Sequence, residues 1–567
     1  MAAKILMIAP DNLDGRDARF LADVMSGQEA RWIGSSTEMM VPLGAMSVCG
    51  WAQRALAENG VRAEFKVIKQ LGSNGELLRQ AEAFRPDFVA FSAMSHNYPN
   101  ALALAGSLKV WARMQGRALP IILGGDHVSG VLRRVVAGSA NAFWDEGLVG
   151  IFEAEAKGKI DFCVVGEGEL TFAELLERLI SSRDYCDVDG IAYFDNSGRI
   201  ALTNPRRRMS NAELDRLAVL REGYESRRFY TKTYLTNPPH PELMGHYDAV
   251  SASRGCAGSC TFCSKETVFP GRVGKRSAKS VADEIEQLSK EGIRHVFFTD
   301  ENFTLDSAWT VALCDELISR GLGKRISWHC QSRVDDFVRR PGDAVEEEGA
   351  RRLLAKMEEA GCCMIAFGIE SISEVDLKGM HKAMNVAQAK KALELVNETG
   401  IFSCALMMFG AQFGKAEKLT EEFVQKHADL LYLADRIRFA VYTPLPGTED
   451  WLRLNDRFNK DFAQRDESDK LIGCKWGLLD TDHETLEGQE GTRELIENIY
   501  AAVYGSERWQ ERVRRKCELH PELEDAFSYW RKVIGKHVAL QDKGTPVSMQ
   551  AARARAGGVV DGGRKIL

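Results

Sequence analysis

Apolar residues over the first part of the chain, residues 1–200, follow an alternating pattern. Short continuous apolar runs, which are typical of buried strands, occupy residues 4–9, 64–68, 87–92, 120–123 and 162–165. Between these runs, apolar residues recur at the spacing of an amphipathic helix over residues 46–59, 73–84 and 97–115. Strands that alternate with helices predict an α/β fold with a parallel, doubly wound, Rossmann-like sheet.

Glycine and polar residues follow several of these predicted strands. They are residues 92–96 (Ser-Ala-Met-Ser-His), 124–127 (Gly-Gly-Asp-His) and 166–169 (Gly-Glu-Gly-Glu). Ligands of doubly wound sheets bind at the carboxyl ends of the strands, and glycine at those ends lets a bulky ligand approach the backbone closely. The sequence therefore predicts a ligand site along this edge of the sheet.

A second series of strands and helices follows a hairpin at residues 191–202 and an aperiodic linker at residues 201–247. Strands are predicted at residues 249–253, 295–299, 326–330, 364–368, 402–409 and 437–442. Helices are predicted at residues 281–290, 307–319, 350–359, 387–399 and 419–430. Ser280 and Asp283 have the spacing of a capping box for the first of these helices. This order predicts a partial (β/α)6 barrel of the TIM type, whose sites lie on the loops at the carboxyl ends of the strands.

Helical patterns return near the end of the chain, at residues 492–504 and 507–537, and predict a small, mostly helical C-terminal domain. The polar and glycine-rich residues after them predict a loose tail. The predicted divisions of the chain are an N-terminal domain at 1–200, a linker at 201–247, a barrel at 248–450, a helical domain at 451–540 and a tail at 541–567.

The composition is that of a soluble globular protein, with 45% apolar and 27% charged residues in 567. A net charge of −7 gives no reason to expect binding to nucleic acid or to an anionic membrane. No apolar stretch approaches the ~20 residues of a membrane span, and the apolar run at the start is too short for a signal peptide. With 13 cysteines, an odd number, the chain is expected to be a reduced cytoplasmic protein without a disulfide framework.

Three cysteines, Cys256, Cys260 and Cys263, lie in one short stretch with C-x3-C-x2-C spacing. A [4Fe–4S] cluster normally has four cysteine ligands, so three ligands would leave one iron open to a substrate or a cofactor. A structural zinc site needs a closed set of four ligands, and the nearest further candidate, His246, lies beyond a predicted strand. The alternatives to a cluster are reduced thiols that are adjacent by chance, or zinc with a ligand from elsewhere.

The cysteine stretch, with Phe262 just before its third cysteine, resembles the signature of the radical S-adenosylmethionine (SAM) superfamily. In that family the open iron of a [4Fe–4S] cluster chelates the amino and carboxylate groups of SAM. Other matching residues end the predicted barrel strands, and among them Arg333 is implied to pair with the SAM carboxylate. The SAM contacts that the resemblance implies are Phe262, Thr299, Glu301, Asn302, Gln331, Arg333, Glu370 and Ser371.

The N-terminal domain is similar to the cobalamin-binding domain that precedes the barrel in one large class of radical SAM enzymes. The matching segments are 42–44 (Pro-Leu-Gly), 85–87 (Arg-Pro-Asp), 124–125 (Gly-Gly) and 166–169 (Gly-Glu-Gly-Glu). Many cobalamin domains bind cobalt through a histidine, but the corresponding loop here, residues 69–75, has none, so Gln70 or Leu71 is expected beneath the metal. The implied cobalamin contacts are Gln70, Leu71, Ser92, Met94, Ser95, Gly124, Gly125, Asp126, His127, Gly166, Glu167 and Gly168.

Together the two resemblances imply a cobalamin-dependent radical SAM enzyme, and in the first instance a C-methyltransferase. Such an enzyme uses its cluster to cleave SAM to a 5′-deoxyadenosyl radical, and methylcobalamin donates the methyl group to an unactivated carbon. An oxidative cyclase or ring-rearranging enzyme of the same superfamily is the alternative, and a non-enzymatic corrinoid- or cluster-binding sensor is a third hypothesis. The expected partners are a small-molecule or peptide substrate and an electron donor such as flavodoxin or ferredoxin.

Overall fold

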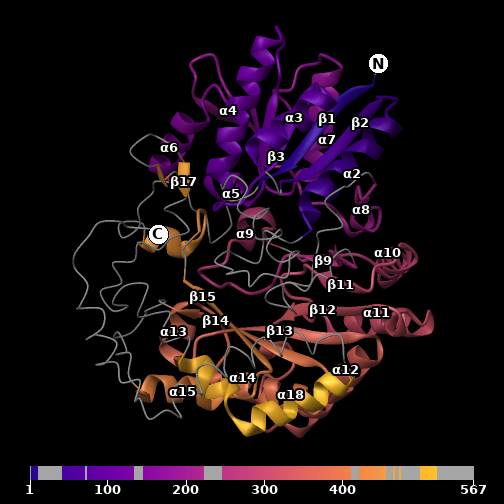
Figure 1. Ribbon diagram of the computed structural model, residues 1–567, viewed down its shortest axis with the longest axis vertical. Coiled ribbons are helices and arrows are strands. Elements are labelled where there is room, and N and C mark those ends of the chain that lie inside the picture. The colour runs from indigo at the N-terminus through magenta and orange to yellow at the C-terminus, as the bar shows by residue number, and fades with distance from the viewer. Residues whose placement is uncertain are drawn as a thin grey trace.

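Two β-sheets, one in each half of the chain, organise the computed structural model, and they lie one above the other along its long axis (Figure 1). The structure describes residues 2–10, 41–70, 73–132, 145–222, 246–271, 273–409, 421–442, 445–454, 464–465, 471–473 and 498–519. Leu71 and the predicted tail at 541–567 lie outside these residues. The predicted boundaries between domains stay predictions.

The N-terminal sheet has seven strands in the order β2-β1-β3-β4-β5-β6-β7. The parallel strands are β1 (Ala3–Ala9), β2 (Ala63–Lys69), β3 (Phe88–Ser92), β4 (Ile121–Gly124) and β5 (Phe162–Val164). The predicted hairpin is confirmed as β6 (Ile191–Phe194) and β7 (Ile200–Leu202), and it extends the edge of this sheet in antiparallel pairing. The doubly wound α/β fold is therefore confirmed, and the hairpin belongs to the sheet.

Helices cover both faces of the N-terminal sheet. They are α2 (Leu43–Glu58), α3 (Asn74–Phe84), α4 (Tyr98–Met114), α5 (Asp126–Leu132), α6 (Glu146–Ala156) and α7 (Gly168–Ile180). Ile5 and Met7 of β1 pack into the core that contains α2 and α7, whereas Leu6 and Ile8 pack into the core that contains α4 and α6. Because successive side chains of a strand point to opposite faces, burial on both faces explains why β1 is an uninterrupted apolar run.

The second sheet has six parallel strands in the order β15-β14-β13-β12-β11-β8, and it is open because β15 and β8 lie at its two ends. These strands are β8 (Tyr247–Val250), β11 (His295–Phe298), β12 (Ser327–Ser332), β13 (Cys362–Glu370), β14 (Phe402–Phe409) and β15 (Arg436–Val441). The principal helices are α10 (Ala278–Lys290), α11 (Ser307–Ser319), α12 (Ala344–Glu359), α14 (Val386–Asn397) and α15 (Glu421–Leu431). The predicted partial (β/α)6 barrel is confirmed.

The predicted cap of α10 was wrong. The helix begins at Ala278, and the Ser277 side chain accepts a hydrogen bond from the Ser280 backbone N–H. The Ser280 hydroxyl instead donates to the Asp215 carbonyl oxygen, 3.1 Å away, in the segment that precedes the barrel. Serine is a good cap at either position, and the long-range contact with Asp215 was not visible in the local pattern.

The C-terminal helix α18 (Glu507–Leu519) packs beneath the barrel, and Figure 1 shows it in yellow at the base. The buried Lys516 ammonium donates to Asp435 Oδ2 and to the Ile401 carbonyl oxygen, both at 2.6 Å. Burial lowers the pKa of Lys516. Burial alone would raise the pKa of Asp435, but the positive charges of Lys516 and Arg512 outweigh that effect and hold the pKa of Asp435 below its ordinary value. This ion pair therefore joins α18 to the segments that enter β14 and β15. None of the helices in the described part of the chain has the length and apolar character to cross a membrane.

Replacement of Lys516 by methionine is expected to destabilise the barrel by about 3–5 kcal/mol, because it leaves the Asp435 carboxylate buried without its closest cation. The measurement is the midpoint of thermal unfolding followed by circular dichroism. Lys390→Met, which alters an exposed lysine on α14, is the control and is expected to leave the midpoint unchanged. Equal midpoints for the two variants would show that α18 does not depend on this ion pair.

Candidate functional site

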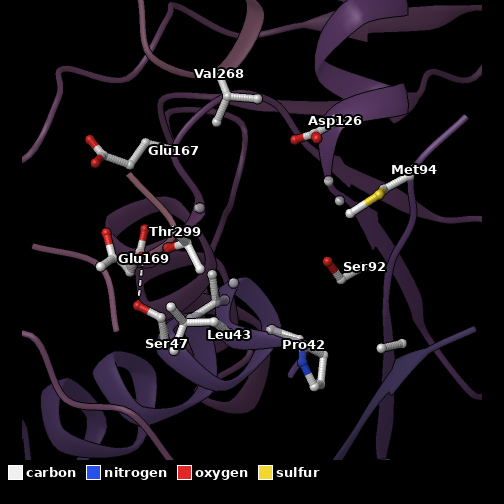
Figure 2. A pocket seen from close by; sticks show the side chains of 18 of the residues that line it. Pro42, Leu43, Ser47, Ser92, Met94, Asp126, Glu167, Glu169, Val268 and Thr299 are labelled. Carbon is white, nitrogen blue, oxygen red and sulfur yellow. Dashed lines mark hydrogen bonds between the residues drawn. The ribbon is translucent and has the colours of Figure 1, made fainter. Parts of the chain in front are cut away.

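A cavity of about 490 Å³ lies between the two sheets, where the carboxyl ends of their strands face each other. Loops after β1, β3, β4 and β5 form one wall, and the segments that follow β8 and β11, with the end of β12, form the other. Figure 2 shows Ser92, Met94 and Asp126 of the N-terminal half on one side of this space and Thr299 of the barrel half on the other. The two ligand edges predicted from the sequence therefore enclose one common cavity.

The N-terminal wall contains most of the residues predicted to contact cobalamin. Those that line the cavity are Ser92, Met94, Gly124, Gly125, Asp126, Gly166, Glu167 and Gly168. Gly125 has φ +104°, and a Cβ atom at this position would lie 2.4 Å from the Ala93 carbonyl oxygen, so no other residue fits the backbone there. Burial raises the pKa of Asp126. This glycine-lined edge suits a large ligand that lies directly on the backbone.

Three other predicted contacts, Gln70, Ser95 and His127, do not line the cavity. The Gln70 amide is hydrogen-bonded to Asn74 at 2.6 Å and to Asn100 at 3.0 Å. His127 Nδ1 lies 3.1 Å from Ser95 Oγ, and burial lowers the pKa of His127 to about 3, so the ring is neutral. These side chains support the wall from behind.

Carboxylates at the end of β11 hold the start of the cysteine loop, which comprises residues 255–264. Asp300 accepts hydrogen bonds from Ser253 Oγ at 2.5 Å and from the Ala252 N–H at 3.1 Å, and burial raises the pKa of Asp300 to about 7. Glu301 Oε2 accepts from the Gly255 N–H at 2.8 Å, and burial raises the pKa of Glu301 as well. Of the predicted SAM contacts, Thr299, Glu301 and Gln331 line the cavity.

The cysteine loop runs from β9 (Ser253–Arg254) to α9 (Lys265–Val268) and holds its three thiols free and partly exposed. Cys256 Sγ accepts from the Gly258 N–H at 3.3 Å, and Cys260 Sγ lies 3.6 Å from Arg333 Nη1. Burial, with smaller contributions from Cys260 and Cys256, raises the pKa of Cys263 to about 12. Because metal ligands must be thiolates, loading this loop must displace protons.

The donor set fits an iron–sulfur cluster better than a single ion. Among the described residues, no group of three Cys, His, Asp or Glu side chains is arranged to hold one metal ion. Ligands of a zinc ion must converge on one point, whereas each thiolate of a four-iron cluster binds a different iron. His246, the candidate fourth zinc ligand, instead lies with its Nδ1 3.3 Å from the Gly292 carbonyl oxygen.

Arg333 is directed at the cysteine loop. Its Nε and Nη2 atoms lie 2.9 and 3.0 Å from the two carboxylate oxygens of Asp335, and Nη2 also donates to the Lys382 carbonyl oxygen. Lys382, which the sequence reading missed, pairs with Glu370 at 2.8 Å. Glu370 has φ +70°, an uncommon conformation for this residue type and one that clusters at functional sites. Arg333 and Lys382 together place positive charge beside Cys260.

The remaining predicted SAM contacts support the loops around the cysteines. The Asn302 side chain accepts from the Arg333 N–H at 3.2 Å. The Ser371 hydroxyl donates to Asp376 at 3.3 Å, and the Phe262 ring packs against a small core that contains Met380 and Tyr442. None of these three predicted contacts lines the cavity between the sheets.

The middle of the cysteine loop is fastened by helix α16 (Glu449–Leu454). Thr261 donates its hydroxyl to Asp450 Oδ2 at 3.0 Å, and the Asp450 N–H donates to the Thr261 carbonyl oxygen at 3.1 Å. The next residue, Trp451, is buried in the core of the N-terminal half and donates to Asp145 Oδ2 at 3.2 Å. Helix α16 therefore connects the cysteine loop to both halves of the chain, a role that no local signal in the sequence indicates.

A second set of contacts that holds the cysteine loop, also not predicted from the sequence, lies just before the start of the loop. The Arg254 guanidinium, two residues before Cys256, is bonded to Glu167 at 2.8 Å and to Glu169 at 2.6 Å. Glu167 ends the loop after β5 and Glu169 lies in the first turn of α7, and both belong to the other half of the chain. The Gly-Glu-Gly-Glu pattern at residues 166–169 predicted a ligand site, but nothing in the sequence indicated that its two carboxylates pair with Arg254.

Residues 250–452 match the family described as the Radical SAM superfamily. Among curated proteins, an uncharacterized methyltransferase from Pyrococcus horikoshii is 30% identical over 52% of this chain and 57% of its own length. An anaerobic magnesium-protoporphyrin IX monomethyl ester cyclase from Cereibacter sphaeroides is 26% identical over 68% of this chain and 56% of its own length. The chain thus spans about half the length of the curated relatives it matches.

Two solved structures share the fold over most of the chain. The cobalamin-dependent SAM radical enzyme OxsB, with aqua-cobalamin and SAM bound, has a TM-score of 0.59 at 14% identity and covers 96% of this chain and 81% of its own. The radical SAM methyltransferase TsrM from Kitasatospora setae, with cobalamin and a [4Fe–4S] cluster bound, has a TM-score of 0.56 at 16% identity and covers 88% of this chain and 89% of its own. At these identities the likeness concerns the fold.

Replacement of Asp450 by alanine is expected to destabilise the chain by about 1–3 kcal/mol, because the buried Thr261 hydroxyl loses its acceptor. It is also expected to speed the alkylation of Cys260 and Cys263, which flank Thr261. The measurements are the thermal midpoint and the alkylation rate of each cysteine by mass spectrometry. Asp429→Ala on the exposed face of α15 is the control. Unchanged alkylation in Asp450→Ala would show that α16 does not hold the loop.

The Asp300 pKa of about 7 predicts a pH-dependent stability. The unfolded chain loses this proton near pH ~4, whereas the folded chain retains it up to about pH 7, so the unfolded state binds fewer protons in this window. Stability must therefore fall as the pH rises through the window. Urea unfolding between about pH 5 and 8 should show a shallower fall for Asp300→Asn than for the parent. Parallel curves would mean that Asp300 ionises normally.

Proposed function

We propose that the chain is a radical SAM enzyme and, more specifically, a cobalamin-dependent methyltransferase that acts on carbon. The observation that carries the proposal is the shared cavity: the glycine-lined edge of the N-terminal sheet faces the barrel mouth, and the cysteine loop begins at the barrel side of this space. Two cofactors on opposite walls could therefore act on one substrate between them. The methyltransferase relatives and the fold shared with OxsB and TsrM support this reading.

The residues present fit the cofactors that this reaction requires. When bound, the [4Fe–4S] cluster supplies the electron that cleaves SAM, and cobalamin supplies the methyl group. In this proposal the cluster ligands are Cys256, Cys260 and Cys263. Thr299, Glu301 and Gln331 would contact SAM, and the glycine-lined edge of the N-terminal sheet would hold cobalamin.

The protein's own side chains bind and orient in this mechanism. Glu301 offers a carboxylate for the SAM ammonium, and its bond to the Gly255 N–H keeps that carboxylate next to the cysteine loop. Arg333 and Lys382 provide the positive charge beside Cys260 that a SAM carboxylate requires. No histidine occurs in residues 69–75, and the Gln70 amide is hydrogen-bonded to Asn74 and Asn100, so the loop after β2 would offer a bound cobalamin no imidazole.

An oxidative cyclase is the second candidate function. The observation that favours it is the cyclase from Cereibacter sphaeroides, which aligns with 68% of this chain, more than the 52% aligned with the methyltransferase from Pyrococcus horikoshii. The cavity does not distinguish the two reactions, because both need a substrate between the barrel mouth and the N-terminal sheet. The fate of the SAM methyl group separates them.

The test is to reconstitute the chain without oxygen, supply a chemical reductant, cobalamin and SAM that carries a deuterated methyl group, and add a small-molecule extract of the source cells. The expected result is about four iron atoms per chain, bound cobalamin, 5′-deoxyadenosine, and at least one compound that has gained the deuterated methyl group. Cys260→Ala is the control, and it should lose iron and 5′-deoxyadenosine together.

The other outcomes each reject a part of the proposal. Formation of 5′-deoxyadenosine with an extract compound that loses hydrogen and gains no label would favour the cyclase. Absence of SAM cleavage by the iron-loaded chain would reject an enzymatic role for the barrel. Failure to retain cobalamin would reject the assignment of the N-terminal wall.

A further inference from the structure

We propose that Arg254 is a positioning residue that sets the distance between the two walls of the cavity, and so couples SAM cleavage to the use of the second cofactor. The inference rests on the proposed function for its chemistry, but its structural basis is independent of any cofactor. The observation is that one buried cation, just before the first cysteine, bonds to two carboxylates of the opposite wall.

The contact joins the two walls at the point where the cysteine loop begins. Arg254 is 7% exposed and belongs to β9, which pairs with β10 (Gly274–Lys275) of the barrel half. Its Nη1 atom lies 2.8 Å from Glu167 Oε1, and its Nη2 atom lies 2.6 Å from Glu169 Oε1. Glu167 and Glu169 both line the cavity, as Figure 2 shows, so this cation contacts the wall assigned to cobalamin.

The two carboxylates are themselves held in place. Glu169 Oε1 accepts from Ser47 Oγ of helix α2 at 2.7 Å, the bond drawn in Figure 2. Glu167 Oε2 accepts from the Met209 N–H at 2.8 Å. Because these hydrogen bonds hold both carboxylates in place, a guanidinium that bonds to both is held in one position. The start of the cysteine loop, two residues further along the chain, is held with it.

The charges at this contact depend on one another. Burial alone would lower the pKa of Arg254 and raise that of Glu169, yet their mutual attraction outweighs burial, so the pKa of Arg254 is raised and that of Glu169 is lowered. Both groups therefore stay charged although they are buried. Buried ion pairs add little net stability compared with apolar contacts, but they fix geometry. Positioning is the role that this arrangement performs better than apolar packing.

A fastening at a different place in the loop supports the same reading. Thr261 is held by Asp450, and the neighbouring Trp451 is buried in the core of the N-terminal half. The loop that carries the cysteines is thus tied to the opposite half of the chain directly before Cys256, and indirectly, through α16, between Cys260 and Cys263. Such a double attachment is not needed to hold a cluster, and it is expected if the distance across the cavity matters.

The consequence concerns coupling. SAM cleavage needs only the barrel half of the chain, because the cysteines, Glu301 and Gln331 all belong to that half. Transfer of a methyl group to the substrate needs both walls of the cavity. If one wall is displaced from the other by about 1 Å, the rate of transfer can fall ~100-fold. Loss of Arg254 should therefore spare 5′-deoxyadenosine formation and lower the amount of methylated product formed per 5′-deoxyadenosine.

The experiment compares the reconstituted holoenzyme carrying Arg254→Met, Arg254→Lys, Glu169→Gln or the double change Arg254→Met with Glu169→Gln. The double variant removes one positive and one negative charge together, so it restores the charge balance without restoring the contact. Arg320→Met is the control, since Arg320 is also bonded to several carboxylates, Asp283 at 2.7 Å, Glu316 at 2.6 Å and Glu286 at 3.4 Å, but on the outer helices of the barrel. Product and 5′-deoxyadenosine are counted in the same reaction.

The expected result is a fall of roughly 10- to 100-fold in product per 5′-deoxyadenosine for Arg254→Met, with a smaller fall for Arg254→Lys because lysine keeps the charge but cannot bond to both carboxylates. The double variant should recover thermal stability, but its yield of product per 5′-deoxyadenosine should stay low. Arg320→Met should keep the parent ratio. A parent ratio in folded Arg254→Met, or recovery of the ratio in the double variant, would overturn the proposal.

Two readouts do not depend on turnover. Pulsed electron paramagnetic resonance of the reduced cluster and cob(II)alamin should give a broader distance distribution in Arg254→Met than in the parent. Hydrogen–deuterium exchange of the chain without cofactors should quicken at residues 166–169 and 253–264 in Arg254→Met and not in Arg320→Met. If the parent transfers no methyl group, the proposed function fails, and the exchange measurement alone decides the positioning role; unchanged exchange would overturn it.

Discussion

Parallel pairing of the strands whose loops line the cavity is the constraint on which the rest of the structure depends. Parallel strands deliver all their forward loops to one edge, and ligands of such sheets are bound at that edge. The two halves meet through these edges, and the cavity of about 490 Å³ is the space left between them. The cysteine loop follows the first barrel strand and is therefore built into this meeting place from the start.

Buried charges then fix the position of the cysteine loop between the two halves of the chain. Arg254 joins the loop to Glu167 and Glu169, while Arg333 joins it to Asp335 and the Lys382 carbonyl. In a low-dielectric interior each of these charges is costly unless its partner is in place, so the loop cannot move without breaking several bonds together. The same burial raises the pKa of the Cys263 thiol, so this thiol must lose a proton before it can bind a metal.

Local patterns in the sequence predicted a strand or helix well where residues within that element determine where it begins and ends. Ser307–Ser319 was predicted to the residue because its apolar spacing and its start after Asp306 lie within one helix. The cap of α10 was wrong because the choice between Ser277 and Ser280 depends on Asp215, far away in the chain. His127 was expected at the ligand edge, yet its ring is turned into the core, because strand order and helix packing decide which way a loop residue faces.

The sequence by itself determined the fold class, the cysteine donor set and the glycine edge, since each depends on residue type and short-range spacing. Only the tertiary structure decided which of those residues share a cavity, which support it from behind, and what fastens the cysteine loop. Asp450 lies 189 residues from Thr261, and Arg254 lies 87 residues from Glu167, so neither pairing has a local signature. Ion pairs and hydrogen bonds form between groups that are close in space, and folding alone brings these groups together.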